Sequence, residues 1–272
     1  MIRMDDIFKT LILSDAPELT LITLNRPQRR NAISFEMIRE LLAALDDCER
    51  RFHAGRLRVL ALTGAGSAFC SGMDLEVLRS LTDSDAGRQR RDSLRMAELF
   101  LRIYRFPAPT IAAVNGPAVA GGCGLASVCD FALAAPEAKF GYTEVRVGYM
   151  PALVAVYLLR QVGEKRARDL LLTGRLIPAA SALEWGLISE IVPAERLLPR
   201  TRELAIELAR NSPASLAATK RLIERLPLEG GLERALEQAA EANAAMRQTA
   251  DFREGVAAFL EKRPPAWQNP GR

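Results

Sequence analysis

Residues 110–130 read TIAAVNGPAVAGGCGLASVCD and contain a strand-to-helix transition from which the fold class can be inferred. The segment from Thr110 to Val114 is apolar and rich in residues that favour strands, which is typical of a buried β-strand. A turn with closely spaced glycines follows from Asn115 to Gly124 and leads into a further apolar segment. A buried strand that passes through a tight loop into a helix indicates a βαβ unit of a mainly parallel sheet.

The same order of strand, loop and helix recurs upstream of this segment. Residues 58–75 read RVLALTGAGSAFCSGMDL, a strand-like run that breaks at Gly64-Ala65-Gly66. A further strand is predicted over Leu19 to Leu24, and helices are predicted around Ile38 to Cys48 and over Arg88 to Tyr104. Strands that alternate with helices predict the α/β class.

The second half of the chain has an almost entirely helical pattern. Ser181 followed by Glu184 has the spacing of a capping box, and Ser212-Pro213 fits the N-cap and first turn of another helix. A last long helix is predicted from near Leu232 to Lys262.

Length and composition predict a globular protein without a membrane segment. The 272 residues are 49% hydrophobic and 26% charged, and neither a signal peptide nor a run of about eighteen apolar residues occurs. The formal charge of +4 fits an anionic substrate, but without a basic stripe it does not indicate nucleic-acid binding. We expect a cytoplasmic protein that binds neither membranes nor nucleic acids, with an α/β core over residues 1–200 and a C-terminal helical subdomain over residues 201–272.

Four cysteines and one histidine limit the metal and nucleophile chemistry. Cys48, Cys70, Cys123 and Cys129 lack the spacing of a zinc or redox motif, which predicts small buried thiols in a reducing compartment. The only histidine, His53, follows a charged run, which predicts an exposed helix end. A Ser-His-Asp triad or a histidine-based metal site would need this residue, so we predict neither and expect no bound metal.

The two glycine-containing loops, residues 64–75 and 115–125, are the candidate functional segments. Each leaves backbone N–H groups free where a helix begins, and such groups bind anions and carbonyl oxygens. Two of them converging on one oxygen would form an oxyanion hole. The alternative is that the glycines serve only tight turns and close packing. A dinucleotide fingerprint is excluded because Phe69 stands where a third glycine is required.

The two loops and their surroundings resemble the enoyl-CoA hydratase/isomerase (crotonase) superfamily over nearly the whole chain. The segments that carry the resemblance are LNRP at 24–27, NAI at 31–33, AFCSGMDL at 68–75, residues 112–130, FGYTEVRVG at 140–148, ALEWGLI at 182–188, EG at 254–255 and FLEKR at 259–263. The resemblance implies a crotonase-like ββα spiral core with a C-terminal helical subdomain used in trimerisation. It also implies homo-trimers, often paired into hexamers.

The same resemblance implies that the substrate is an acyl thioester of coenzyme A, and no cofactor other than this CoA is expected. By position, the backbone N–H groups of Met73 and Gly122 would form the oxyanion hole, and Asp74 would shape the loop. Lys262 matches a late family lysine that approaches the CoA phosphates from a neighbouring subunit. The residues implied to contact CoA or its thioester are Ala68, Gly72, Met73, Asp74, Leu75, Gly121, Gly122 and Lys262.

Glu144 lies where the superfamily keeps its general acid/base, after a strand-like stretch and an aromatic residue. A partly desolvated carboxylate at this position would have a raised pKa and could exchange protons at neutral pH. From the residues alone, a simple ion pair between Glu144 and Arg146 is the alternative.

The sequence departs from the family pattern at Gly124, where hydratases with two catalytic glutamates carry the first of them. A single glutamate is sufficient to move a proton between two carbons, as in the related Δ3,Δ2-enoyl-CoA isomerases. Residues 144–153, EVRVGYMPAL, instead resemble the methylglutaconyl-CoA hydratase-like members, which act on branched chains. We expect a hydratase that adds or removes water across an enoyl-CoA double bond, with an isomerase as the alternative.

Overall fold

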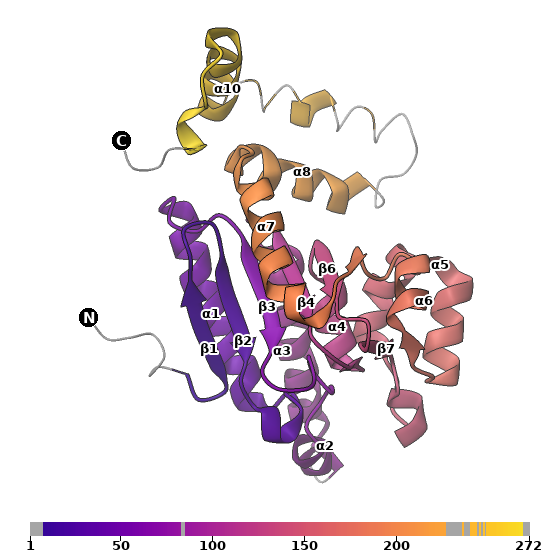
Figure 1. Ribbon diagram of the computed structural model, residues 1–272. Coiled ribbons are helices and arrows are strands. Elements are labelled where there is room, and N and C mark those ends of the chain that lie inside the picture. The colour runs from indigo at the N-terminus through magenta and orange to yellow at the C-terminus, as the bar shows by residue number, and fades with distance from the viewer. Residues whose placement is uncertain are drawn as a thin grey trace.

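The computed structural model describes residues 8–82, 85–226 and 249–268, together with residues 236, 240–243, 245 and 247. Its centre is a six-stranded sheet in the order β1-β2-β3-β4-β6-β9 (Figure 1). β1 and β2 pair antiparallel, and the other neighbours in this sheet are parallel. The strands are β1 Leu11–Asp15, β2 Thr20–Leu24, β3 Leu60–Gly64, β4 Thr110–Val114, β6 Phe131–Ala134 and β9 Glu190–Ile191.

A second sheet of three short strands, in the order β5-β7-β8, positions the candidate site. These strands are β5 Ala118–Val119, β7 Lys139–Gly141 and β8 Ile177–Pro178. β5 and β7 run parallel, and each is followed by a helix: β5 by α4 and β7 by the 3-10 helix η3. The helices are α1 Phe35–His53, α2 Leu75–Thr82, α3 Ala86–Tyr104, α4 Gly121–Ser127, η3 Glu144–Val147, α5 Ala152–Thr173, α6 Ala179–Glu184, α7 Leu197–Ala209, α8 Pro213–Arg225 and α10 Ala250–Glu261, with further 3-10 turns η2 Pro27–Arg29, η4 Ala194–Arg196 and η6 Ala266–Gln268.

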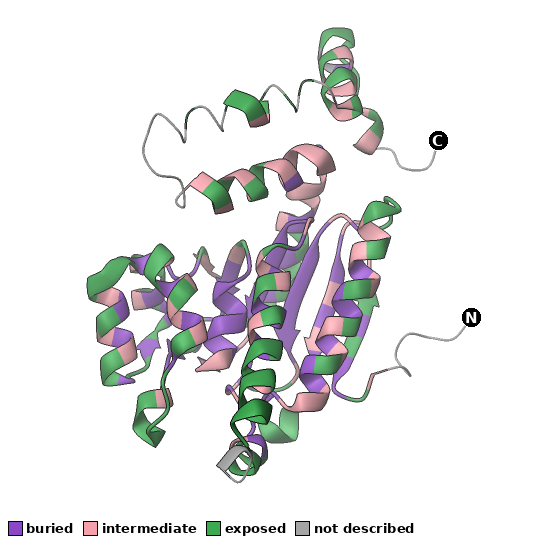
Figure 2. Ribbon diagram, turned by 180° about the vertical axis from the view of Figure 1, so that it is seen from behind, coloured by how far each residue is buried: buried purple, intermediate pink, exposed green. Residues whose placement is uncertain are grey.

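Two layers of helices cover the central sheet. α1 and α3 lie on one face and α7 on the other (Figure 1, Figure 2). Successive side chains of a strand point to opposite faces. Leu60 and Leu62 of β3 therefore join the larger apolar cluster, whereas Ala61 joins a smaller cluster with Leu197 and Ala205 of α7. Burial of both faces explains the uninterrupted apolar strands, and the predicted α/β class is confirmed.

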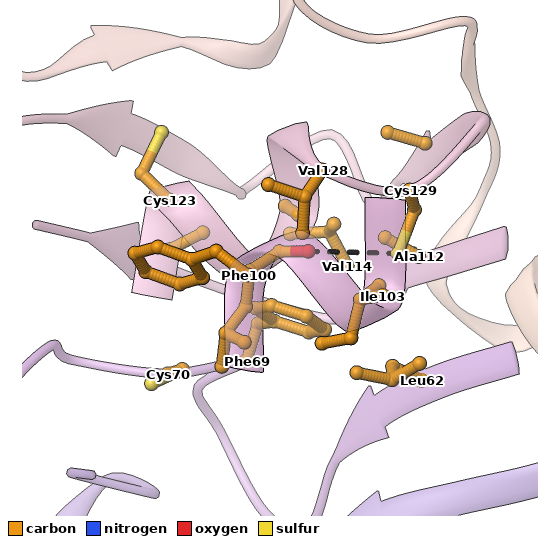
Figure 3. Packing of buried hydrophobic residues seen from close by; sticks show 14 of the residues in the cluster. Leu62, Phe69, Cys70, Phe100, Ile103, Ala112, Val114, Cys123, Val128 and Cys129 are labelled. Carbon is orange, nitrogen blue, oxygen red and sulfur yellow. Dashed lines mark hydrogen bonds between the residues drawn. The ribbon is translucent and has the colours of Figure 1, made fainter. Parts of the chain in front are cut away.

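The larger cluster also contains the buried cysteines. Phe69, Phe100 and Cys123 are fully buried in it (Figure 3). All four cysteines are free and buried, as predicted, and the Sγ of Cys129 lies 3.5 Å from the carbonyl oxygen of Leu125. Burial raises the pKa of the Cys70, Cys123 and Cys129 thiols to about 12, so they stay protonated at neutral pH.

The two cap predictions have different outcomes. Ser212 caps α8 as predicted, because its Oγ accepts a hydrogen bond from the N–H of Ser215 at 3.1 Å. The capping box at Ser181 is wrong, because α6 already begins at Ala179, directly after the extended residue Pro178. Ser181 therefore lies inside the first turn, and no side chain caps this helix.

The C-terminal helix differs from the prediction over residues 232–262. α10 begins only at Ala250, and the hydroxyl of Thr249 accepts a hydrogen bond from the N–H of Phe252 at 3.1 Å. Such a hydroxyl cap favours a new helix start at this position over a continuous helix. Before Ala250, the described residues 236, 240–243 and 245 are helical as predicted, residues 247 and 249 are not, and residues 232–235, 237–239, 244, 246 and 248 lie outside the described residues.

The other helices complete the core and the C-terminal part of the chain. His53 is the last residue of α1 and its side chain is 66% exposed, as predicted. Residue 200 lies inside α7, which buries Leu197 and Ala205 against the central sheet. The division into residues 1–200 and 201–272 stays a prediction. Of the helices that the structure describes, none has both the length and the hydrophobicity needed to cross a membrane.

Candidate active site

The two glycine loops meet through their backbones. The N–H of Val119 donates a hydrogen bond to the carbonyl oxygen of Cys70 at 2.9 Å. A Cβ at Gly122 would lie 2.2 Å from the same oxygen, much closer than a side-chain carbon can approach it. Gly72 has a φ of 88°, and a Cβ there would lie 2.9 Å from the Cβ of Ala120. Only glycine allows this close contact between the loops.

The N–H groups of Met73 and Gly122 are both left without an acceptor by the local backbone geometry. Met73 stands opposite Ile33 in a single parallel bridge, whose bonds join Ile33 N–H to Gly72 O at 2.7 Å and Asp74 N–H to Ile33 O at 3.0 Å. The N–H of Met73 takes no part in this bridge. Gly122 is the second residue of α4, where a helical N–H has no acceptor within the helix. Within the described part of the chain, neither N–H donates a hydrogen bond.

A buried polar network holds the first loop. Arg26 pairs with Asp74 Oδ2 at 2.8 Å, and their side chains are 17% and 5% exposed. Asp74 Oδ1 accepts the N–H of Glu76 at 3.0 Å, and the amide of Asn31 donates to the carbonyl oxygen of Ala68 at 2.8 Å. Burial by itself would raise the pKa of the Asp74 carboxyl, but the hydrogen bonds from Glu76 and Arg26 hold that pKa below its usual value. Both carboxylate oxygens of Asp74 are therefore engaged inside the loop.

Glu144 begins η3, three residues after β7 ends. Its Oε2 atom is buried and has no hydrogen-bond partner among the described residues. Burial raises the pKa of its carboxyl because the charged form loses solvation. No ion pair joins Glu144 to Arg146 in the part of the chain that the structure describes.

A cavity of about 210 Å³ lies between α2, α3, η3 and the start of α5. Met73 and Gly121 line it together with Glu144. Glu144 and Asp92 are the charged side chains among the described lining residues, and the other polar ones are hydroxyls. A mainly apolar wall with a few polar groups suits the acyl part of a small-molecule ligand. The apolar wall includes Phe35, Leu75, Leu78, Met96, Phe100 and Leu153.

Gly124 lies against two apolar side chains of this wall. A Cβ at Gly124 would lie 2.6 Å from Cγ1 of Val154 and 2.9 Å from Cζ of Phe100. The space that a side chain would need at this position is already filled, and protein interiors are close-packed. The packing of Val154 and Phe100 therefore leaves no room for a glutamate side chain at position 124.

Some of the other predicted site residues line the cavity and others do not. Leu75 lines it at the start of α2, whereas Ala68, Gly72 and Gly122 are buried in the loops and do not line it. Lys262 is exposed and follows α10, which lies at the opposite end of the molecule from α2 (Figure 1). The single chain does not bring Lys262 to the cavity, so its approach from a neighbouring subunit stays a prediction. In the described ranges, no group of three or more His, Cys, Asp or Glu side chains could hold a metal ion.

Two contributors to the site were not predicted from the sequence. Asn31 has a φ of 54°, is fully buried and bonds two carbonyl groups of the first loop. Asp92, Met96 and Phe100 of α3 line the cavity. Their four-residue spacing is visible in the sequence and places them on one helix face, but only the packing of α3 reveals which face meets the cavity.

Comparisons with known proteins agree with this arrangement. The family model described as enoyl-CoA hydratase/isomerase matches residues 16–270. A relative from Thermus thermophilus is 49% identical over 247 residues, covering 91% of this chain and 96% of its own. The 2,3-dehydroadipyl-CoA hydratase of Escherichia coli is 35% identical over 260 residues, covering 94% and 97%.

Solved structures extend the agreement to three dimensions. The enoyl-CoA hydratase from Shewanella pealeana superposes with a TM-score of 0.92 at 30% identity, covering 97% of each chain. Pseudomonas aeruginosa AtuE gives a TM-score of 0.89 at 35% identity, covering 96% of this chain and all of its own. The predicted crotonase fold is confirmed by these likenesses. With a matching family model over almost its whole length and relatives well above 30% identity, the chain belongs to the enoyl-CoA hydratase/isomerase family.

Proposed function

We propose that this protein is an enoyl-CoA hydratase. Such a lyase adds water across the double bond next to a CoA thioester, or removes water to form that double bond. The observation that carries the proposal is the buried, unpartnered Oε2 of Glu144 in a cavity that Met73 and Gly121 also line. The names of the relatives support the same reaction.

In the proposed reaction, the thioester carbonyl oxygen accepts hydrogen bonds from the N–H groups of Met73 and Gly122. Each well-placed donor of this kind stabilises a transition state by about 3 kcal/mol. Glu144 takes a proton from water while the water oxygen bonds to the β-carbon, and the electron pair of the double bond moves toward the thioester oxygen as an enolate. Glu144 then returns the proton to the α-carbon, so hydrogen and hydroxyl add to the same face.

The environment of Glu144 suits both proton transfers. Burial raises the pKa of its carboxyl, which brings the protonated and ionised forms closer in free energy near neutral pH. A group that must take and then return a proton works best under this condition. Oε2 also keeps its capacity to accept a hydrogen bond from a reacting water, because no group of the described chain bonds to it.

A single carboxylate has to perform both transfers, because Phe100 and Val154 fill the space beside Gly124. The competing reaction is the Δ3,Δ2-enoyl-CoA isomerisation, in which Glu144 would move one proton between two carbons without adding water. The two reactions differ in whether the product gains a water molecule, and this difference is measurable.

The acyl chain, the CoA contacts and the assembly are finer parts of the proposal. Ala152 and Leu153 line the cavity, which supports the branched acyl chain suggested by residues 144–153. CoA would lie along the loop from Ala68 to Leu75, with Lys262 supplied by a neighbouring subunit of a cytoplasmic trimer or hexamer. Light scattering tests the assembly, since a mass of one 29.9 kDa chain would contradict it.

The test of the reaction is mass spectrometry of straight-chain enoyl-CoAs and 3-methylglutaconyl-CoA incubated with the protein in heavy water. A product that gains the mass of one water supports the hydratase. An unhydrated acyl chain that has only exchanged hydrogen for deuterium supports the isomerase and overturns the proposal.

Two glutamate variants separate the mechanism from a general loss of charge. Glu144→Gln should lower kcat at least about 100-fold, because an acid/base group contributes that much. Glu137→Gln removes the same charge from an exposed site outside the cavity and should keep the activity. Intact catalysis by Glu144→Gln would overturn the mechanism.

A further inference from the structure

Asp92 is a second carboxylate of the cavity, and the proposed reaction does not use it. Its Oδ2 atom is buried and accepts no hydrogen bond in the described part of the chain. Arg88, one turn earlier on α3, has its Nε 3.9 Å from this oxygen, which is beyond hydrogen-bond distance. A buried oxygen without a donor is unfavourable, and a ligand that brings a donor relieves this cost.

The position of Asp92 on α3 places it toward one end of the cavity. Asp92, Met96 and Phe100 follow one another at intervals of four residues on one helix face, and all three line the cavity. Phe100 lies at the end of the cavity near the glycine loops, because its ring packs against Gly124 of α4. Asp92 lies two helical turns from Phe100, about 12 Å along the helix axis. Asp92 is therefore placed to meet the tail of an acyl chain and not its reacting carbons.

The charged side chains that line the cavity have one sign, although Arg88, which does not line it, forms an ion pair with Asp92 at 3.9 Å. The described lining residues include Asp92 and Glu144 but no lysine, arginine or histidine. A carboxylate at the end of an acyl chain would be desolvated next to Asp92 without a cation in the wall, and like charges in such a position repel strongly. A hydroxyl or ammonium group at the same place would instead donate a hydrogen bond to the Asp92 carboxylate.

We propose that Asp92 is a specificity residue that favours acyl chains ending in a hydrogen-bond donor, a hydroxyl or an ammonium group, and disfavours chains ending in a carboxylate. The inference rests on the proposed function, because it assumes that the acyl chain of an enoyl-CoA occupies this cavity. It restricts the branched-chain alternative to chains without a second carboxylate, and it therefore speaks against 3-methylglutaconyl-CoA itself.

The test compares kcat/KM for four chains of matched length: hex-2-enoyl-CoA and its derivatives with a terminal hydroxyl, amino or carboxylate group, repeated with the eight-carbon series. We expect the hydroxyl or amino derivative to exceed the plain chain about tenfold, and the carboxylate derivative to fall about tenfold below it. A preference for both donor groups indicates hydrogen bonding, whereas a preference for the amino group alone indicates charge pairing. Equal values for all four chains, or a preference for the carboxylate, would overturn the inference.

Variants on one helix supply the control. Asp92→Asn keeps the size and an acceptor oxygen but removes the charge, so it should reduce the amino preference and the carboxylate penalty about tenfold each. Glu98→Gln removes the same charge from an exposed position of α3 outside the cavity and should leave the wild-type ratios unchanged. A structural role of Asp92 would change all four substrates by one common factor, and this outcome would also contradict the inference.

Binding of saturated analogues tests Asp92 without catalysis. Calorimetry with hexanoyl-CoA and its hydroxyl, amino and carboxylate derivatives should give the same order of dissociation constants. If this order holds while no enoyl-CoA is hydrated, the proposed function fails and the role of Asp92 stands. If hex-2-enoyl-CoA is hydrated but the order is absent, the role of Asp92 fails and the proposed function stands.

Discussion

Replacing Gly124 by alanine tests whether the apolar wall excludes a side chain where other hydratases carry a glutamate. The new Cβ would lie 2.6 Å from Cγ1 of Val154 and 2.9 Å from Cζ of Phe100, whereas two carbons prefer about 3.5–4.0 Å. Overpacking of this kind costs about 1–3 kcal/mol. Because Gly124 lies inside α4, alanine regains up to about 1 kcal/mol of helix propensity. We expect Gly124→Ala to lower the free energy of unfolding by about 1–2 kcal/mol.

The assay is urea unfolding at fixed protein concentration for Gly124→Ala, Val154→Ala and the double variant. In the double variant the new methyl group occupies space that Val154 vacates, so the combined loss should be at least about 1 kcal/mol smaller than the two separate losses together. Val192→Ala is the control, because Val192 lies in the apolar cluster on the α7 side of the sheet and its effect should simply add. A stabilised Gly124→Ala protein, or additive losses with Val154→Ala, would refute the claim that these side chains fill the position.

Further predictions concern pH dependence and capping. Folding raises the pKa of Glu144, so its carboxyl stabilises the fold at low pH, and this contribution is lost as the pH rises above the ordinary glutamate value. When the free energy of unfolding is measured against pH, the stability of Glu144→Gln relative to the wild type should therefore increase from acidic to neutral pH. Folding lowers the pKa of Asp74, so its carboxylate stabilises the fold at neutral pH, and this stabilisation is lost as the pH falls below the ordinary aspartate value. In Asp74→Asn the free energy of unfolding should therefore fall less steeply with decreasing pH in the acidic range. An unchanged acid dependence would contradict the lowered pKa of Asp74. Ser212→Ala removes the cap of α8 and should cost about 1 kcal/mol in urea unfolding, whereas no loss would show that the cap is dispensable.

Three of the six strands of the central sheet, β2, β3 and β4, could be predicted because each is a short, mainly apolar run that ends at a turn signal, whereas β1, β6 and β9 were not predicted. β4 has the predicted bounds, and β2 and β3 differ from the prediction by no more than two residues at either end. The signal is strong because β3 and β4 are buried on both faces, and because the polar residues within the three strands are threonines, which themselves favour strands. The glycines of the two loops were visible for a related reason, since the backbones approach too closely for any side chain.

The rest of the site depends on contacts between distant segments, which leave little trace in any one of them. β5 and β8 are two residues long and exist only because β7 lies between them. The start of α6 was misplaced because Ser181 has the right spacing for a cap while the chain already turns helical at Ala179. That the Asp92 carboxylate lines the cavity follows from the packing of α3, and the sequence around it is an ordinary charged helix start.

The packing that excludes a second glutamate also helps to explain how the remaining one can act alone. Phe100 and Val154, which fill the space beside Gly124, line the same mainly apolar cavity as Glu144. Where two carboxylates lie close together, their repulsion raises one of the two pKa values; here burial, and not repulsion from another carboxylate, raises the pKa of Glu144. A single carboxylate whose pKa is raised by burial can both accept and return a proton. In the proposed reaction, the burial of Glu144 therefore supplies the raised pKa that repulsion from a second glutamate would otherwise provide.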